Sequence, residues 1–111
     1  MTETEFLVRA DNILDQIEDQ AEGWFEHRDI DVDANREGQV LTLVFNAKSH
    51  VVINAQTPLQ EMWLAAPTGA FHYRLEGESW VDTRGGLELA EQISKRCSEI
   101  VGQELVVTIK G

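Results

Sequence analysis

The 111-residue chain is poor in several residue types, and each scarcity excludes a class of protein. Its single cysteine, Cys97, excludes an intramolecular disulfide and a thiolate metal site. The sequence shows neither an apolar run of 18 residues nor the hydrophobic segment of a secretory signal, so we expect a reduced, cytoplasmic protein with no membrane partner. Basic residues are also few, with 9 Lys and Arg against 20 Asp and Glu. Because nucleic-acid phosphates are bound by clustered Lys and Arg, we expect no nucleic-acid partner.

The negative charge is concentrated in one part of the chain. The formal net charge is −11, and residues 1–33 hold 11 acidic and two basic side chains, a net charge of −9. No lysine precedes Lys48. The other 78 residues carry 9 acidic and 7 basic side chains, which is the mixed surface of an ordinary globular protein.

Apolar periodicity changes along the chain and predicts a helix, a series of strands and a second helix. Residues 4–25 have apolar side chains at intervals of three and four, and Leu87–Val101 repeats that spacing before a capping Gly102. The predicted strands, joined by short turns, are Asp29–Asp33, Gln39–Phe45, Ser49–Ala55, Gln60–Ala65, Ala70–Leu75 and Ser79–Asp82. Leu105–Ile109 is either a last short strand or a tail laid along the helices. We predict one α+β domain over residues 1–111, a two-layer sandwich in which an antiparallel sheet of five or six strands carries both helices on one face.

Nine carboxylates form a row, the acidic ridge, on the side of the first helix away from its apolar stripe and on the strand that follows. They are Asp11, Asp15, Glu18, Asp19, Glu22, Glu26, Asp29, Asp31 and Asp33. Strict alternation places the last three on one face of the predicted strand. Six like-charged pairs at i,i+3 or i,i+4 each destabilise the helix by about 0.2–0.5 kcal/mol. A row shaped only for solubility would include lysines, so we expect something positive to bind there, either a cation or a basic protein surface.

The ligand atoms of the acidic ridge are carboxylate oxygens, which suit hard ions such as Ca²⁺, Mg²⁺, Mn²⁺, Fe²⁺ and Fe³⁺. An exposed row supplies one or two ligands per ion and leaves water in the other positions. Binding is therefore expected to be weak, multiple and open to competition. No Ser/His/Asp or Cys/His arrangement indicates nucleophilic catalysis, and we predict that the protein is not an enzyme. Cys97 is interpreted as a core residue, and His50 and His72 as isolated strand residues.

Trp63 is a second candidate for binding. Met62 and Leu64 share one strand face, so Trp63 points the opposite way, toward the sheet surface that no helix covers. It either packs across neighbouring strands or serves as an interface anchor, with the amides of Asn54 and Gln56 as neighbours.

Several motifs together resemble the frataxin family, in its bacterial form, over nearly the whole chain. The acidic helix runs into Asp29-Ile30-Asp31, and the most distinctive stretch is Asn54-x-Gln56-x-Pro58-Leu59 followed by Trp63-Leu64-Ala65. Gly69-x-Phe71-His72-Tyr73 and Trp80-x-Asp82-x-Arg84-Gly85 extend the resemblance.

The resemblance implies a helix–sheet–helix sandwich and a regulatory, iron-binding role in iron–sulfur cluster assembly. It implies weak binding of Fe²⁺ and Fe³⁺ on the acidic ridge and contact with a cysteine desulfurase and a scaffold protein. By position, the ridge carboxylates match Glu18, Asp19, Glu22, Asp29, Asp31 and Asp33. Of these, Glu18, Asp19 and Glu22 are also expected to contact the partner, and Asn54, Gln56 and Trp63 match a partner-binding sheet surface.

An alternative function is a ferroxidase that stores iron in oligomers, as is proposed for some relatives. It requires paired metals held by converging ligands, which the sequence does not indicate. We expect a monomer, with iron-driven oligomers left open.

Overall fold

The computed structural model describes residues 1–110, which form two helices and six strands. In chain order these are α1 (Glu3–Arg28), β1 (Val32–Glu37), β2 (Val40–Phe45), β3 (Ser49–Gln56), a 3-10 turn (Thr57–Leu59), β4 (Glu61–Ala66), β5 (Gly69–Glu76), β6 (Ser79–Asp82) and α2 (Leu89–Val101). Neither helix in this part of the chain is long and apolar enough to cross a membrane.

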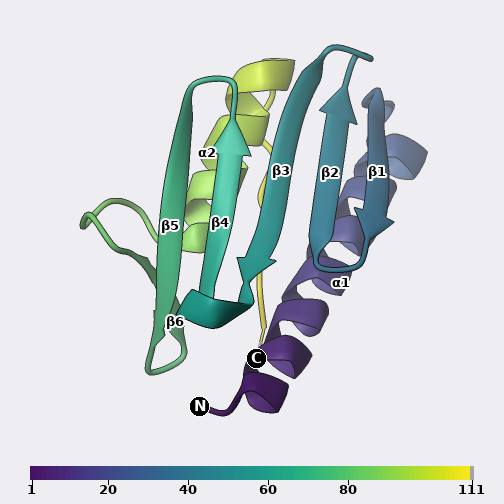
Figure 1. Ribbon diagram of the computed structural model, residues 1–111. Coiled ribbons are helices and arrows are strands. Elements are labelled where there is room, and N and C mark those ends of the chain that lie inside the picture. The colour runs from purple at the N-terminus through teal and green to yellow at the C-terminus, as the bar shows by residue number, and fades with distance from the viewer. Residues whose placement is uncertain (111) are drawn as a thin grey trace.

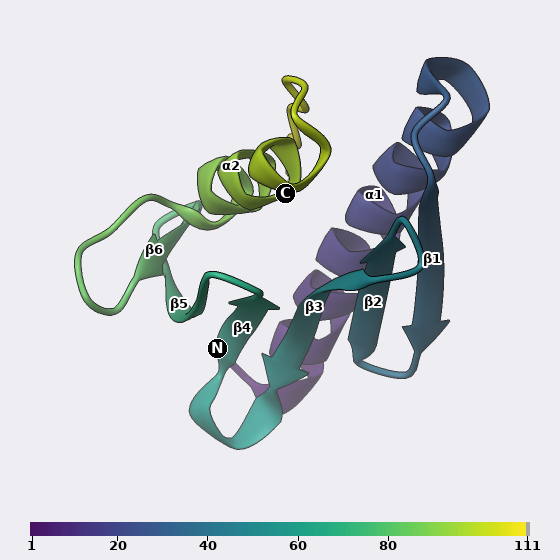
Figure 2. The same ribbon diagram turned by 90° about the horizontal axis from the view of Figure 1, so that it is seen from above.

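The strands form one antiparallel sheet in the order β1-β2-β3-β4-β5-β6. Both helices lie behind this sheet (Figure 1), and α1 runs behind β1, β2 and β3 when the molecule is seen from above (Figure 2). The predicted two-layer sandwich is therefore confirmed, with six strands. Tight turns keep each strand beside its neighbour in sequence. Gly38 and Gly77 adopt positive φ angles of 57° and 63° in two of these turns, a conformation that glycine adopts without steric cost.

The core lies between the helices and the sheet. The apolar stripe of α1 is buried throughout, from Phe6 to Trp24. Strand residues alternate as expected: Leu41, Leu43 and Phe45 of β2 are fully buried, whereas the residues between them are only partly covered. One face of the sheet is therefore free of helices and carries the side chains that point away from the core.

Helix α1 is longer than predicted. It begins with a capping box between Thr2 and Glu5 and continues to Arg28. Asp29 then takes a left-handed conformation with φ 53°, and its N–H donates to the carbonyl oxygen of Trp24. The prediction of a strand over Asp29–Asp33 is wrong in its bounds, because Asp29 caps the helix and β1 begins at Val32. An apolar–polar alternation alone does not distinguish a helix cap from the first residues of a strand.

The C-terminal segment is a tail along the helices, which is one of the two predicted alternatives. In Figure 1 it descends as a thin yellow segment beside the helices. Its backbone makes hydrogen bonds with side chains of both helices in alternation: Thr108 and Lys110 bond to Gln20 and Gln16 of α1, and Leu105 and Val107 bond to Ser98 and Ser94 of α2. Side chains of Leu105 and Val107 are buried, so the tail completes the core between the helices.

Candidate metal and protein-binding surface

The acidic ridge lies along the edge of the molecule where α1 borders the edge strand β1. Most of its carboxylates are exposed, and only Asp11 and Glu18 are partly covered. Asp29 and Asp31 lie in the connection to β1, and Asp33 lies within this strand. The prediction that Asp29, Asp31 and Asp33 share one strand face is therefore wrong, although all three are exposed near the C-terminal end of α1.

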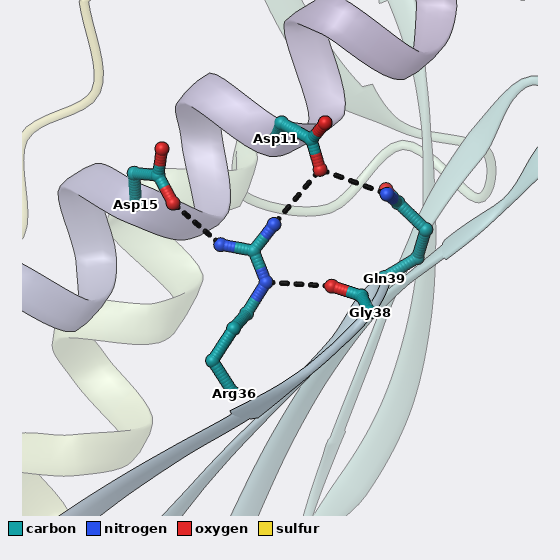
Figure 3. Close-up of polar contacts among 5 residues, drawn as sticks. All are labelled: Asp11, Asp15, Arg36, Gly38 and Gln39. Carbon is teal, nitrogen blue, oxygen red and sulfur yellow. Dashed lines mark hydrogen bonds and ion pairs between the residues drawn. The ribbon is translucent and has the colours of Figure 1, made fainter.

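An arginine of the chain itself occupies the first part of the acidic ridge (Figure 3). Arg36 of β1 donates from Nη2 to Asp11 Oδ1 at 2.8 Å and from Nη1 to Asp15 Oδ1 at 2.6 Å. Its Nε donates to the carbonyl oxygen of Gly38 at 2.7 Å, and Gln39 Nε2 donates to Asp11 Oδ1 at 2.8 Å. The Arg36 side chain is only 17% exposed, so solvent screens these ion pairs less than it would on an open surface.

The remaining ridge carboxylates have no such internal counter-ion. Within residues 1–110, none of Glu18, Asp19, Glu22, Asp29, Asp31 and Asp33 forms an ion pair, and Glu26 has only an exposed His27 at 3.8 Å. The negative charge available to an external cation is therefore concentrated between residues 18 and 33.

A pocket of about 250 Å³ lies in this unpaired part, between the end of α1 and the start of β1. It is lined by Glu22, Phe25, Glu26, Val32, Asp33 and Ala34. Three of the six lining residues are acidic, two from the helix and one from the strand. No group of three His, Cys, Asp or Glu side chains in the described chain is close enough to hold one metal ion. The acidic ridge is accordingly an open row of carboxylates.

The sheet-face cluster is a second group of polar and aromatic side chains, on the face that carries no helix. Trp63 lies opposite Asn54 of β3 on one side and His72 of β5 on the other. Its indole stacks on the His72 ring, with centroids 3.9 Å apart and 3° between the planes. Trp63 Nε1 donates to Glu61 Oε1 at 2.9 Å, and Glu61 lies opposite Gln56.

The antiparallel register thus brings together the three residues singled out on the sheet, Asn54, Gln56 and Trp63. Trp63 points away from the core as predicted, since Met62 and Leu64 on either side of it are buried. The sequence led us to interpret His72 as an isolated strand residue, whereas its ring stacks on the Trp63 indole. The signal that would have found it is the hairpin register: a two-residue turn at Pro67-Thr68 pairs Trp63 with His72 directly.

Comparison with known proteins identifies the family. A model described as the frataxin-like domain matches residues 1–103. The chain belongs to the frataxin-like family. The prediction made from its motifs is therefore confirmed.

Relatives of this frataxin-like chain cover almost all of it. A protein of Bordetella petrii named iron-sulfur cluster assembly protein CyaY is 50% identical over 109 residues, which are 98% of this chain and 100% of the relative. A Cupriavidus metallidurans protein of the same name is 43% identical and spans 96% of both chains.

Solved structures agree with the fold. Frataxin from Psychromonas ingrahamii superposes with a TM-score of 0.79 at 30% identity, covering 97% of this chain and 99% of that one. A trimeric frataxin from the yeast Saccharomyces cerevisiae, complexed with ferrous iron, superposes with a TM-score of 0.73 at 31% identity, covering 86% and 87% of the two chains.

Proposed function

We propose that this frataxin-like protein is a non-enzymatic accessory factor and regulator of iron–sulfur cluster assembly. The observation that carries the proposal is the concentration of unpaired carboxylates between residues 18 and 33, on a chain whose relatives are named iron-sulfur cluster assembly proteins. The acidic ridge would bind iron weakly as cargo and would also dock a basic surface of a cysteine desulfurase. The sheet-face cluster would contact the scaffold protein.

Weak iron binding follows from the chemistry of the ridge. Carboxylate oxygens suit Fe²⁺ and Fe³⁺ as well as competing hard cations. Because the carboxylates stand in an open row, an ion would take one or two protein ligands and keep water in its other positions. Asp11 and Asp15 are expected to bind ions less well than the residues that follow, because Arg36 already compensates half of their charge and occupies one oxygen of each.

Titration with Fe²⁺ under anaerobic conditions tests the metal claim. In ¹⁵N-labelled protein, we expect the amide signals of residues 18–33 to shift or broaden first, and those of residues 11–15 only at higher iron concentration. Mn²⁺ added first should compete with iron. Changes spread evenly over the chain, including the sheet face, would contradict iron binding at the ridge.

Docking of a desulfurase is argued from charge. An acidic patch with no internal counter-ions attracts a basic protein surface, raises the association rate and makes binding sensitive to salt. We expect the double substitution Glu18→Lys and Glu22→Lys to weaken desulfurase binding at least tenfold and to flatten its salt dependence.

A matched control separates docking from net charge. Glu78→Lys with Glu91→Lys makes the same change in net charge at two exposed positions, one in the turn between β5 and β6 and one in the first turn of α2. Binding measured by titration calorimetry between 50 and 300 mM NaCl should be close to wild type for this control. Equal losses in the two double variants would show that only overall charge matters, and unchanged affinity in the ridge variant would refute the docking claim.

A further inference from the structure

The stacked pair of Trp63 and His72 joins an aromatic side chain to a titratable one on the helix-free face of the sheet. The two rings are nearly parallel, with centroids 3.9 Å apart and 3° between the planes. His72 Nδ1 also lies 3.9 Å from Glu61 Oε1. The same oxygen accepts the hydrogen bond from Trp63 Nε1 at 2.9 Å. One carboxylate oxygen of Glu61 therefore faces both rings.

Both contacts of His72 depend on its charge, which a histidine changes between pH 5 and pH 8. The neutral imidazole stacks on the indole as one aromatic ring on another. The protonated ring is a cation over the face of a tryptophan, which attracts cations more strongly than the other aromatic side chains do. It also forms an ion pair with Glu61, whereas the neutral ring does not. A proton on His72 therefore strengthens its contact with Trp63 and its contact with Glu61 together.

The charged groups on β4 and β5 leave Glu61 available to His72. Arg74 lies opposite Glu61 and two residues beyond His72 on β5, but its Nε donates to Glu76 Oε2 at 2.7 Å. Within residues 1–110, the ion-pair contact of Glu61 is with His72. The Glu61 side chain is only 21% exposed, so solvent screens its charge less than on an open surface. The His72 side chain is 43% exposed and can exchange its proton with water.

The other neighbours of His72 contribute one acid, one base and neutral groups. Asp82 and Arg84, at the end of β6 and in the loop after it, line a pocket together with His72, and Asp82 forms no ion pair with it. The residues of β3 that lie opposite Trp63 and Glu61 are the neutral Asn54 and Gln56. Both helices lie behind the sheet, on its other face (Figure 1). Protonation of His72 therefore acts chiefly through Trp63 and Glu61.

We propose that the sheet-face cluster is a pH-sensitive switch, in which protonation of His72 fixes the Trp63 indole between the imidazolium ring and Glu61. A side chain that is already fixed loses less conformational freedom on binding. The cluster therefore binds the scaffold protein more tightly at pH 5.5 than at pH 8, by about two- to fivefold for contacts that are partly exposed. The proposal rests on the proposed function in one respect, that the sheet-face cluster contacts the scaffold protein.

The motion of the Trp63 indole tests the switch without any partner. In ¹⁵N-labelled protein, we would measure the heteronuclear NOE of the Trp63 Nε1 signal between pH 5.5 and pH 8. We expect the NOE to be higher at pH 5.5, in step with protonation of His72. His72→Phe keeps a stacked ring that takes no proton, so its Trp63 signal should not respond to pH. His50→Phe removes another strand histidine and should respond as the wild type does.

Binding of the scaffold protein, measured by calorimetry at both pH values, tests the consequence. We expect the ratio of the affinities at pH 5.5 and pH 8 to be two- to fivefold larger in the wild type and in His50→Phe than in His72→Phe. A Trp63 signal that ignores pH in the wild type, or that responds equally in His72→Phe, would overturn the switch, and so would equal affinity ratios. An indole response without scaffold binding at either pH would refute the sheet-face part of the proposed function and still support the switch.

Discussion

Cys97 illustrates how far single residues are predictable from the sequence. Its place on the apolar stripe of the second helix predicts a core residue, and the side chain is fully buried. Desolvation by burial raises the pKa of the Cys97 thiol to about 12. The thiol therefore stays protonated and is a poor nucleophile in the folded protein near neutral pH.

Because of this thiol, the free energy of unfolding is expected to fall as the pH rises in the alkaline range. The unfolded chain releases the thiol proton near pH 8.5, whereas the folded chain keeps it until about pH 12, so deprotonation favours unfolding as the pH rises above 9. We expect the free energy of unfolding to fall by about 1 kcal/mol between pH 9 and pH 10 on account of this group. Urea denaturation at the two pH values measures it.

Cys97→Ala is the control for the thiol. The substitution leaves a cavity and lowers stability at every pH. It also removes the part of the pH dependence of the free energy of unfolding that the thiol causes. The stability difference between wild type and variant should therefore narrow from pH 9 to pH 10. A constant difference would show that the folded and unfolded thiols titrate alike.

Other residue roles require packing information that the sequence does not contain. Arg36 is one of seven basic residues after residue 33, and no spacing rule marks it as the partner of Asp11 and Asp15. That role depends on how β1 lies against α1. The stacking of His72 on Trp63 likewise depends on the register of a hairpin. Apolar periodicity predicts the core, but it carries no information about polar pairs between residues that are far apart in the sequence.

At the scale of elements, the apolar stripe of α1 is predicted correctly, since the apolar residues spaced by three and four from Phe6 to Trp24 are buried. The boundaries were less accurate, because they depend on capping. The first helix extends through Arg28 into the left-handed Asp29, and the second begins at Leu89 after its side-chain cap Glu88. The tail could not be assigned from sequence because two of its partners, Gln16 and Gln20, are more than 80 residues away.

The tail is held by a ladder of side-chain amides that imitates a neighbouring strand. Gln16 donates to the Lys110 carbonyl at 2.7 Å and accepts from its N–H at 2.8 Å, and Gln20 does the same with Thr108 at 2.8 and 2.9 Å. These bonds tie the C-terminal segment to α1 and close the core over Leu105 and Val107.

Removing this ladder should loosen the tail. We expect Gln16→Ala with Gln20→Ala to lower the free energy of unfolding by about 1–3 kcal/mol, since each substitution removes two partly exposed hydrogen bonds to the tail. Amide hydrogen exchange at Thr108 and Lys110 should become much faster, while exchange in the β2 core should change only with global stability. Gln103→Ala, at an exposed position, is the control. Exchange at Thr108 as slow as in the wild type would contradict the ladder.

At the scale of the whole molecule, the apolar core stabilises the fold, whereas the concentrated negative charge does not. The sandwich has a continuous apolar core, and the sheet leaves one face uncovered. Most of the acidic residues behind the net charge of −9 in residues 1–33 lie at one edge, where the single charge of Arg36 offsets part of the charge of Asp11 and Asp15. Like charges held together in this way lower stability. The arrangement is explained if a cation or a basic partner binds there during iron–sulfur cluster assembly.

An iron–sulfur cluster assembly assay tests this central claim most directly. Cluster formation on the scaffold would be followed with desulfurase, at several Fe²⁺ concentrations, with and without the protein. We predict that the wild type and the control Glu78→Lys/Glu91→Lys change the rate of assembly to the same extent, and that Glu18→Lys/Glu22→Lys leaves it near the rate without the protein. A ridge variant as effective as the wild type, or a wild type without effect at any iron concentration, would contradict the account.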